Sequence, residues 1–449
     1  FALRSVARDL AEKKTTNASS LSGDDSSCSA TVSSVLGIER FERGHDKGSS
    51  HGHSRVYRKA YFEHSNYVPW VQYSVKEFHQ LEQKQENSST RILHECGVLV
   101  VVSEKDRSWL DAALSSAKEH NIPTETLTAD ELKKRFPQFR YQIDNQNNSK
   151  DMEMIGIFEP EAGMVRPERA IRAALHEAEN DYGATIWENT VVHSLREVND
   201  NNGGTSYVEL VVERRKENDT STTTETVTAR TVLVAAGAWT SELIPSWKPH
   251  LKPIRILQTW VNVSNTQNPQ LYDSPNMPCM AMVVHPDLPL PVYCLPADSR
   301  SGDDDLIDDF DGHAQYKDCV KLGIHGGEKI DPNENVTQKV TLEEEANMLR
   351  CIKTTLCEDI SNAATSSSSL ETKPCMYTMT IDEHFMVGVP KSMTNVCAVA
   401  GLSGHGFKMA PALGQMLSDF AMEKDIKKRK EILEVKWNAA FCSPARFGV

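Results

Sequence analysis

The sequence has no apolar run of the length that crosses a bilayer, and no two cysteines share the C-x-x-C spacing. A membrane-spanning helix needs about 20 mainly apolar residues in succession. The ten cysteines are scattered, which favours free thiols in a reducing compartment over a disulfide framework or a zinc site. The first residues, FALRSVARDL, have no secretory signal pattern. We therefore expect an intracellular protein that is not secreted and holds no metal.

Positive charge is also in short supply, because 49 Lys and Arg stand against 63 Asp and Glu, for a net charge of −14. This balance argues against nucleic acid and against an anionic membrane as partners. It does not exclude a small anionic substrate, since one arginine can bind a carboxylate. The 449 residues suggest two domains. Polar tracts at 15–34, 301–312 and 361–372 are interpreted as surface loops.

Strands and helices are mixed along the chain. Apolar spacing predicts helices at 1–14, 62–85, 107–120, 128–136, 168–182 and 405–423. Strands are predicted in VLGIERFE, ECGVLVVVS, TIWENTVVHSLREV, SYVELVVERR, TVLVAAG and much of 253–297. Because several helices begin after glycine-bearing turns, the pattern favours an α/β fold with a second domain rich in strands.

The segment at 48–58, GSSHGHSRVYR, combines small residues with Arg55 and Arg58. Small residues let the backbone approach a ligand closely. If the segment is helical, residues three apart are neighbours, and two adjacent guanidinium groups favour an anion. The alternative is two surface arginines bonded to carboxylates elsewhere, and the spacing alone favours this alternative.

The segment VKLGIH, at 320–325, alternates strictly between apolar and other residues. On a strand, this period places Lys321, Gly323 and His325 on one face. That face can line a polar pocket, or it can meet solvent on an edge strand, and the pattern does not separate the two.

Two further motifs lie near the C-terminus. In CMYTMTIDEHF, at 375–385, Cys375 and Tyr377 share a strand face, and a buried, inert cysteine is the ordinary interpretation. In GLSGHGFKMAPALGQ, at 401–415, a glycine-rich turn leads into a helix whose first turn contains Lys408. A helix N-terminus presents free N–H groups and partial positive charge, which suits an anionic ligand.

In their order and spacing these segments resemble the family of monomeric sarcosine oxidase, N-methyl amino acid oxidase and pipecolate oxidase. The matching segments are VLGIERFE, GSSHGHSRVYRKAY, FEPEAGMV, VLVAAGAW, VKLGIH, CMYTMTIDEHF and AGLSGHGFK. The resemblance runs from Phe1 to about residue 425, and the last two motifs are the most specific. It implies a monomeric FAD enzyme that oxidises a secondary amino acid, N-methyl or cyclic, to an imine with dioxygen, giving hydrogen peroxide. Eukaryotic relatives are often peroxisomal, so the compartment is expected to be the cytoplasm or the peroxisome.

The resemblance also assigns residues to FAD. Glu39 matches the acid that bonds the adenosine ribose, and Cys375 matches the cysteine that carries FAD covalently through its sulfur. The expected cofactor-binding residues are Glu39, Ser49, Ser50, His51, Val192, Gly237, Cys375, Gly404, His405, Gly406, Phe407 and Lys408.

Substrate and oxygen are assigned in the same way. The residues expected to bind the substrate are Arg58 and Lys408, which clamp its carboxylate, and Tyr293, which bounds the pocket. The expected catalytic residues are Lys321, His325, Arg55, Tyr293 and Tyr377. Lys321 matches the lysine that activates dioxygen, because a fixed cation stabilises the negative charge that develops there.

The sequence departs from the family at its start, where the G-x-G-x-x-G turn is absent and Phe1 aligns inside the helix that should follow it. We expect an α/β (α+β) fold with a Rossmann-like FAD-binding domain whose parallel sheet is truncated at its N-terminal side, and weakened FAD binding. The second domain is expected to carry an antiparallel substrate sheet. The FAD-binding domain is assigned to 1–85, 155–245 and 375–449, and the substrate domain to 86–154 and 246–374.

Two other functions stay open on the sequence. One is a flavin dehydrogenase with another electron acceptor, against which Lys321 argues. The other is a truncated, inactive homologue, against which the retained set of Arg58, Lys321, His325, Cys375 and Lys408 argues. The sequence does not identify the amino acid substrate.

Overall fold

The computed structural model describes residues 1–20, 34–84, 91–141, 153–199, 206–215, 221–285, 288, 290–298, 316–335, 339–365 and 369–449. The acidic tract at 301–312 and most of the tract at 15–34 lie outside the described residues. The chain forms two compact units: unit 1 is Phe1–Lys47, Ile171–Lys252 and Thr378–Val449, and unit 2 is Gly48–Ala170 and Pro253–Tyr377.

This division differs from the one assigned from the sequence mainly at 48–85, which groups with unit 2 rather than with the remainder of the expected FAD-binding domain. Strand pairing gives the reason. Strand β2 (Arg55–Tyr57) pairs with β7 (Gly163–Val165), which also pairs with β3 (Leu93–Glu95). All three strands of this small sheet therefore lie in unit 2.

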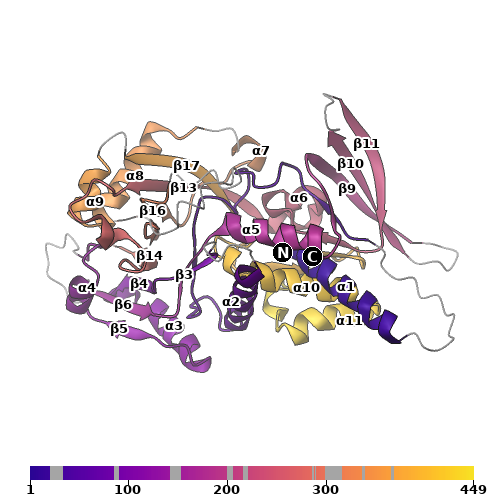
Figure 1. The fold of residues 1–449 in the computed structure, drawn as a ribbon, viewed down its shortest axis with the longest axis horizontal. Helices are drawn as coiled ribbons and strands as arrows, with labels where there is room; N and C mark the ends of the chain where they lie inside the picture. Colours follow the sequence, from indigo (N-terminus) through magenta and orange to yellow (C-terminus); the bar gives the residue numbers. More distant parts are fainter. Residues whose placement is uncertain are drawn as a thin grey trace. The chain divides into compact units, whose positions relative to one another are not determined.

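The described residues of unit 1 form three small sheets. A parallel pair joins β1 (Leu36–Ile38) to β8 (Thr185–Trp187). A second sheet has the order β12-β19-β18, in which β12 and β19 are parallel; its strands are β12 (Val232–Val234), β18 (Met386–Gly388) and β19 (Val396–Ala400). The third is an antiparallel ribbon (Figure 1) of β9 (Thr190–Val198), β10 (Tyr207–Arg215) and β11 (Thr222–Ala229).

Helix α1 (Ala2–Ser20) lies along α10 (Ala410–Met422) in unit 1, as Figure 1 shows. The two backbones approach so closely that a Cβ on Gly414 would lie 2.8 Å from the carbonyl carbon of Phe1. Residues 15–20 were expected to belong to a loop, and this expectation was wrong, because the helix continues to Ser20. The other helices of unit 1 are α5 (Pro167–His176), which starts in unit 2, α6 (Thr240–Leu243) and α11 (Ile426–Glu431).

Unit 2 is built on a mixed sheet of eight strands in the order β17-β13-β16-β15-β14-β4-β6-β5. Its strands are β4 (Val98–Ser103), β5 (Glu125–Leu127), β6 (Met154–Glu159), β13 (Lys252–Asn262), β14 (Cys279–Val284), β15 (Val292–Leu295), β16 (Cys319–Ile324) and β17 (Leu370–Met379). Strand β16 lies between β13 and β15 and is antiparallel to both. The segment VKLGIH therefore occupies an interior strand, and its interpretation as an edge strand is excluded.

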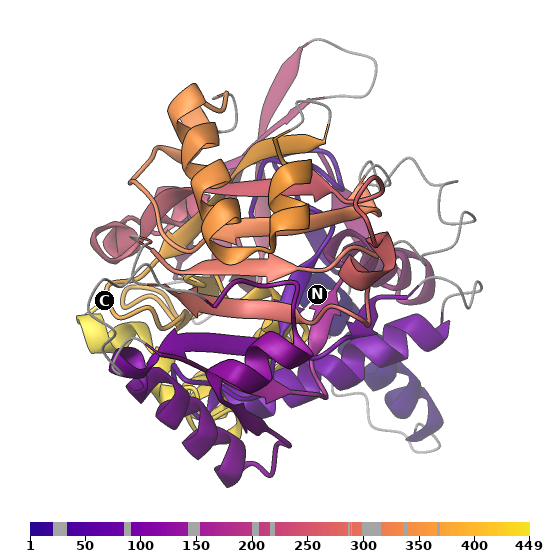
Figure 2. The ribbon, with the colours of Figure 1, turned by 90° about the vertical axis from the view of Figure 1, so that its left-hand side faces the viewer.

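One face of this sheet packs against helices α8 (Leu342–Thr355) and α9 (Glu358–Ala363), drawn in orange in Figure 2. Val320 and Leu322 of β16 join this core. Since side chains alternate along a strand, Lys321 and Gly323 face the opposite side, as the sequence predicted. The loop expected at 361–372 was wrong at both ends, because α9 reaches Ala363 and β17 begins at Leu370, while 366–368 are not described.

The remaining helices of unit 2 are α2 (Tyr67–Lys84), α3 (Ser108–Glu119), α4 (Ala129–Arg135) and α7 (Pro332–Asn335). The first three confirm helices expected from apolar spacing. Helix α4 begins where Thr128 and Glu131 form a capping box, which satisfies N–H groups that the first turn leaves open. Within the described part of the chain, no helix has both the length and the apolar character to cross a membrane.

Candidate active site

Lys321 is the most unusual residue of unit 2, because its side chain is 2% exposed and carries an amine into the protein interior. Its Nζ donates hydrogen bonds to the carbonyl oxygens of Gly52, at 2.8 Å, and Ser54, at 2.9 Å. Burial, followed by the positive charge of Arg55, holds the pKa of Lys321 well below its ordinary value, while Cys375 and Glu168 oppose this effect. A buried amine with a perturbed pKa marks a candidate functional site.

Two tyrosines lie beside this lysine. Tyr293 of β15 lies opposite Gly323 of β16, and a Cβ on Gly323 would come within 3.0 Å of the phenol of Tyr293. Glycine at 323 therefore makes room for the tyrosine ring. Tyr377 of β17 shares a hydrogen bond with Tyr293, and its ring centre is 5.6 Å from that of His325. Burial raises the pKa of Tyr293 to about 12, so both phenols stay protonated at neutral pH.

Cys375 is 2% exposed on β17 and lies close enough to Lys321 and both tyrosines to influence the pKa of each. The structure thus brings together six of the residues expected from the sequence. This unit 2 cluster consists of Arg55, Tyr293, Lys321, His325, Cys375 and Tyr377. Expectation and geometry agree in placing them together, while their chemical roles stay predictions.

The loop at 48–55 passes over this cluster within unit 2. The buried carboxylate of Glu168 accepts hydrogen bonds from the backbone N–H groups of Gly52, at 2.6 Å, and His53, at 3.0 Å. Arg55 donates to the carbonyl of Ser49 at 2.7 Å, and the Ser49 hydroxyl donates to the carbonyl of Met376 at 2.8 Å. The loop conformation is therefore set by side chains of distant segments.

Behind the loop lies a buried charged network. Arg166 forms an ion pair with Asp298 at 2.9 Å and contacts Nδ1 of His53 at 2.8 Å. His94 lies 3.5 Å from the same aspartate, and burial lowers the pKa of His94 to about 4 despite that neighbour. His94 is therefore neutral at physiological pH, and Asp298 is paired mainly with Arg166.

Arg58, expected to bind the substrate carboxylate, is 5% exposed and is engaged within unit 2. Its Nη2 donates to both carboxylate oxygens of Glu63, at 2.7 and 2.8 Å, and its Nη1 donates to the carbonyl of Ala60 at 2.8 Å. The guanidinium lies over the rings of Tyr61 and Phe62. These bonds leave Nε–H and one Nη1–H of Arg58 without a partner among the described residues.

The other expected residues of the loop differ in exposure. His51 is 3% exposed and lies in the interior of unit 2, whereas Ser50 is exposed. Ser49 is exposed as well, although its hydroxyl is held by the carbonyl of Met376.

In unit 1, Glu39 follows directly after β1, at the carboxyl end of the parallel pair. Its N–H donates to Trp187 O at 2.8 Å, its Oε1 accepts from Phe41 N at 3.0 Å, and its side chain is 41% exposed. Gly237, just after β12, has φ +51°, and its Cβ position has no atom within 4 Å. A carboxylate at the end of a strand, as at Glu39, suits the ribose of an adenosine. A backbone without a side chain, as at Gly237, lets a phosphate approach closely.

The glycine-rich turn at 401–406 precedes a 3₁₀ turn, Phe407–Met409, which continues into α10. Gly404 has φ +80°, a conformation that favours glycine. Lys408 is 6% exposed, and its Nζ donates to His405 O at 2.9 Å. His405 in turn packs against Phe385 with ring centres 4.6 Å apart. Lys408 and His405 are thus ordered within unit 1.

The last residues expected near the cofactor also lie in unit 1. Gly406 caps the 3₁₀ turn, and the ring of Phe407 makes an edge contact with Phe1 at 6.3 Å. Val192 is half-buried on β9. Lys408 and these residues belong to unit 1, whereas Arg58 and Lys321 belong to unit 2.

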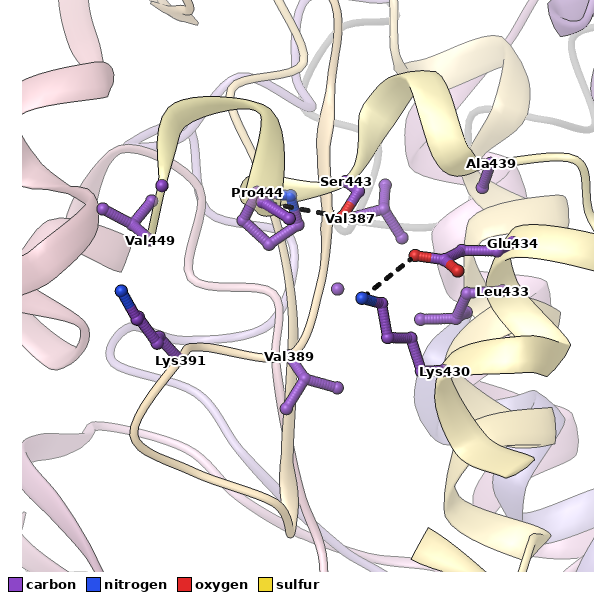
Figure 3. Close-up of a pocket in the computed structure, with 13 residues that line it drawn as sticks. Val387, Val389, Lys391, Lys430, Leu433, Glu434, Ala439, Ser443, Pro444 and Val449 are labelled. Carbon is purple, nitrogen blue, oxygen red and sulfur yellow. Dashed lines mark hydrogen bonds and ion pairs between the residues drawn. The ribbon is translucent and has the colours of Figure 1, made fainter. Parts of the chain in front are cut away.

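Unit 1 also has a pocket of about 360 Å³, shown in Figure 3. Its wall is mainly apolar, including Val387, Leu433 and Pro444, and Lys430 and Glu434 form an ion pair of 3.5 Å there. It contains none of the residues expected to bind cofactor or substrate.

Sequence reasoning missed three residues that shape the unit 2 cluster: Gln258, Glu168 and Arg166. Glu168 begins a segment predicted only as a helix, Arg166 lies outside every predicted element, and their partners are more than a hundred residues away. Gln258 left a signal, since it is the polar member between Ile256 and Trp260 on one strand face.

The residues present fit a flavin cofactor. In unit 1 the fit rests on the half-exposed Glu39 and on Gly237, whose Cβ position is open. In unit 2 it rests on a buried lysine in a cluster with two phenols. Fold and site together define a class of nucleotide-cofactor redox enzymes.

The comparison with protein families gives the same class. Residues 27–420 match the DAO family, described as FAD dependent oxidoreductase. This match covers most of the chain, and the protein therefore belongs to the DAO family of FAD-dependent oxidoreductases.

The chain is also similar to individual relatives. It is 28% identical over 393 residues to monomeric sarcosine oxidase of Bacillus sp. (strain B-0618), covering 86% of each chain. It is 27% identical to peroxisomal sarcosine oxidase of Mus musculus, covering 87% of this chain and 86% of the relative. It is 27% identical to N-methyl-L-tryptophan oxidase of Yersinia pestis (strain Pestoides F), covering 87% and 89%. The resemblance to sarcosine oxidases inferred from the motifs is confirmed.

Solved structures support the fold. NikD, an amino acid oxidase of nikkomycin biosynthesis, aligns with a TM-score of 0.63 at 16% identity and covers 94% of this chain and 91% of its own. Glycine oxidase from Geobacillus kaustophilus aligns with a TM-score of 0.61 at 16% identity, covering 98% and 94%. At this identity the likeness establishes the fold class, which confirms the α/β prediction.

Proposed function

We propose that this protein is an oxidase of secondary amino acids. The substrate loses one hydrogen from its nitrogen and one from the adjacent carbon, so that the C–N bond becomes a C=N bond. Dioxygen accepts the two electrons and two protons and is released as hydrogen peroxide. The imine is then hydrolysed by water. The observation that carries the proposal is the buried Lys321, held among Arg55, Cys375 and two tyrosines in a family of FAD-dependent oxidoreductases.

The cofactor, when bound, supplies a two-electron acceptor for the substrate and passes those electrons to dioxygen. Glu39 would hold its ribose, and the residues that follow Gly401 would lie near the ring. We further propose that the sulfur of Cys375 forms the covalent link. Its position beside Lys321 and Tyr377 supports this assignment, because a thiol needs neighbouring charge or hydrogen bonds to react.

Arg58 and Lys408 are proposed to bind the substrate carboxylate. A carboxylate pairs well with guanidinium because two oxygens meet two N–H donors. Arg58 retains two such hydrogens after its bonds to Glu63 and Ala60. Positioning the substrate through its acid group lowers the barrier by reducing the freedom of the reacting atoms.

The tyrosines and His325 are proposed to surround the substrate amine. An ammonium ion has no lone pair to assist removal of hydride, so the reactive form is the neutral amine. Tyr293 and Tyr377 have raised pKa values and therefore act as neutral hydrogen-bonding walls rather than as bases. This leaves His325, next to Tyr377, as the candidate group to receive the amine proton.

Lys321 is proposed to act in the oxygen half-reaction. A fixed positive charge stabilises negative charge as dioxygen receives electrons. The Lys321→Met variant should therefore slow reoxidation of the reduced enzyme by oxygen, by roughly 100-fold or more, while the rate at which the substrate reduces the enzyme changes little. Equal slowing of both half-reactions would remove this role from Lys321.

The proposed function is tested by a peroxide-coupled screen of the FAD-loaded protein with sarcosine, N-methyl-L-tryptophan, pipecolate and L-proline. Peroxide is expected from at least one of these acids, and none from the matching amine without a carboxylate. Reduction of the enzyme by one of these acids without peroxide formation, followed by electron transfer to an artificial acceptor, would identify a dehydrogenase. No reduction by any secondary amino acid would refute the proposal.

We also propose that the protein acts as a monomer inside the cell, in the cytoplasm or the peroxisome. The similarity to a peroxisomal sarcosine oxidase supports the second compartment. Light scattering of the purified protein and imaging of the fluorescently tagged full-length gene product would decide the two points.

A further inference from the structure

Gln258 and Lys321 reach the same small space from neighbouring strands of unit 2. Gln258 lies on β13, opposite Gly323, and its side chain is almost fully buried. A Cβ on Gly52, which has φ +100°, would come within 3.0 Å of the Gln258 side-chain oxygen and would lie 3.4 Å from Nζ of Lys321. Both polar atoms therefore border the space that glycine at 52 leaves open.

One hydrogen-bond donor and one acceptor that border this space have no partner among the described residues. An ammonium group has three N–H donors, and two of those on Lys321 are taken by the carbonyls of Gly52 and Ser54. The Oε1 atom of Gln258 is a buried acceptor with no hydrogen-bond partner among the described residues. Buried acceptors in folded proteins nearly always have a donor. One remaining donor and one remaining acceptor thus share one space.

We propose that Gln258 is a positioning residue for Lys321, and that its Oε1 accepts a hydrogen bond from one water molecule that in turn accepts the third N–H of the lysine ammonium. Two backbone carbonyls and this water would then accept all three N–H groups of the amine. In a neutral amine the two N–H groups would be satisfied by the backbone carbonyls alone, and Gln258 would be left without a donor. All of these donors and acceptors therefore have partners only when Lys321 is protonated.

The charges around Lys321 show why such an acceptor matters. Arg55 and Arg166 disfavour a further positive charge, whereas Glu168 and Cys375 favour it. The ring of Trp260 also lies 5.5 Å from Nζ. Burial and the arginines lower the pKa of Lys321, so acceptors of the ammonium are needed to keep it charged.

A neutral acceptor has an advantage over a carboxylate at position 258. Glutamate would neutralise the lysine by forming an ion pair, while the glutamine amide leaves the full positive charge available. This inference rests on the proposed function for its catalytic meaning, because Lys321 is there the charge that faces oxygen. The hydrogen bond itself does not depend on that function.

The direct test is the titration of Lys321 in the folded, FAD-loaded protein labelled with ¹³C and ¹⁵N lysine, with Lys321→Met identifying its resonance. Gln258→Met removes the acceptor at similar volume and should lower the titration midpoint by about one pH unit, a tenfold change in the protonation equilibrium. Gln258→Glu should raise the midpoint above that of the unaltered protein. Gln138→Met is the matched control, since Gln138 is also buried in unit 2 but donates to Leu271 and Asn276.

An unchanged midpoint in Gln258→Met, or no rise in Gln258→Glu, would overturn the inference. If Gln258→Met does not fold, the glutamate variant has nearly the native shape and decides the question alone. Stopped-flow reoxidation adds a second measurement, with about a tenfold slowing expected for Gln258→Met at a pH between the two midpoints. Shifted midpoints together with normal reoxidation in Lys321→Met would instead refute the oxygen role and leave the hydrogen bond standing.

Discussion

The contact between Gly323 and Tyr293 gives a prediction that can be worked out from the structure. Gly323 lies on β16 directly opposite Tyr293 on β15. Its φ is not in the left-handed range, so the backbone itself accepts any residue. A methyl group at 323 would, however, come within 3.0 Å of the phenol ring and hydroxyl of Tyr293. The substitution Gly323→Ala should therefore act through this clash alone.

The expected magnitude combines two opposing effects. Replacing a strand glycine by alanine normally stabilises a protein by about 0.5–1 kcal/mol, because the unfolded chain has less freedom to lose. Overpacking of a buried contact costs about 1–3 kcal/mol. The net effect of Gly323→Ala should be a loss of about 1–2 kcal/mol, equivalent to a decrease in Tm of roughly 2–8 °C.

Thermal unfolding of four proteins tests this reasoning: the unaltered chain, Gly323→Ala, Tyr293→Ala and the double variant. Once the ring is removed, alanine at 323 should be neutral or slightly stabilising, so the two substitutions should be strongly non-additive. Activity should follow the same pattern, since a displaced Tyr293 loses its hydrogen bond to Tyr377. If Gly323→Ala costs the same with and without the ring, the steric explanation fails.

Three further predictions follow from other parts of the structure. In Cys375→Ser, protein precipitated with acid should lose its flavin, whereas Cys351→Ser should keep it; retention in both variants would exclude the proposed link. Arg58→Met should raise KM for the amino acid roughly 10–100-fold, the value of a charge-assisted hydrogen bond, without changing turnover of an amine that lacks a carboxylate; an equal effect on both substrates would contradict the clamp. Burial lowers the pKa of His94 from 6.5 to about 4, so as pH falls through that window the unfolded state takes up the proton first and stability decreases, by about 3 kcal/mol at most. Chemical unfolding at several pH values should show a flatter slope in His94→Leu, and a slope as steep as that of the unaltered protein would contradict this assignment.

Much of the fold could be predicted from local patterns. Alternation in VKLGIH placed Lys321 and Gly323 on one face, and the sheet confirms it, because the period of a strand is strictly two. The end of helix α1 could not be predicted in this way. Residues 15–20 contain threonine, asparagine and serine, which form helices weakly, yet the helix continues to Ser20.

The residues of the candidate site also fall into those that could be predicted from the sequence and those that could not. Lys321, Tyr293, Tyr377 and Cys375 were expected from motifs, and the structure places them together. Glu168 was not expected, because a carboxylate that accepts two backbone hydrogen bonds from a loop 115 residues earlier leaves no local pattern. Contacts of this kind depend on tertiary structure and cannot be read from periodicity.

The hydrogen bonds that fix the loop at 48–55 affect how this part of the protein can bind a small molecule. Glu168 holds two of its amide groups and Lys321 holds two of its carbonyls, and both side chains are buried. This backbone therefore loses its conformational entropy when the protein folds, before any small molecule binds. A ligand that binds against this loop does not have to order it, so binding carries no such entropic cost. The fixed shape of the loop can then contribute to selectivity.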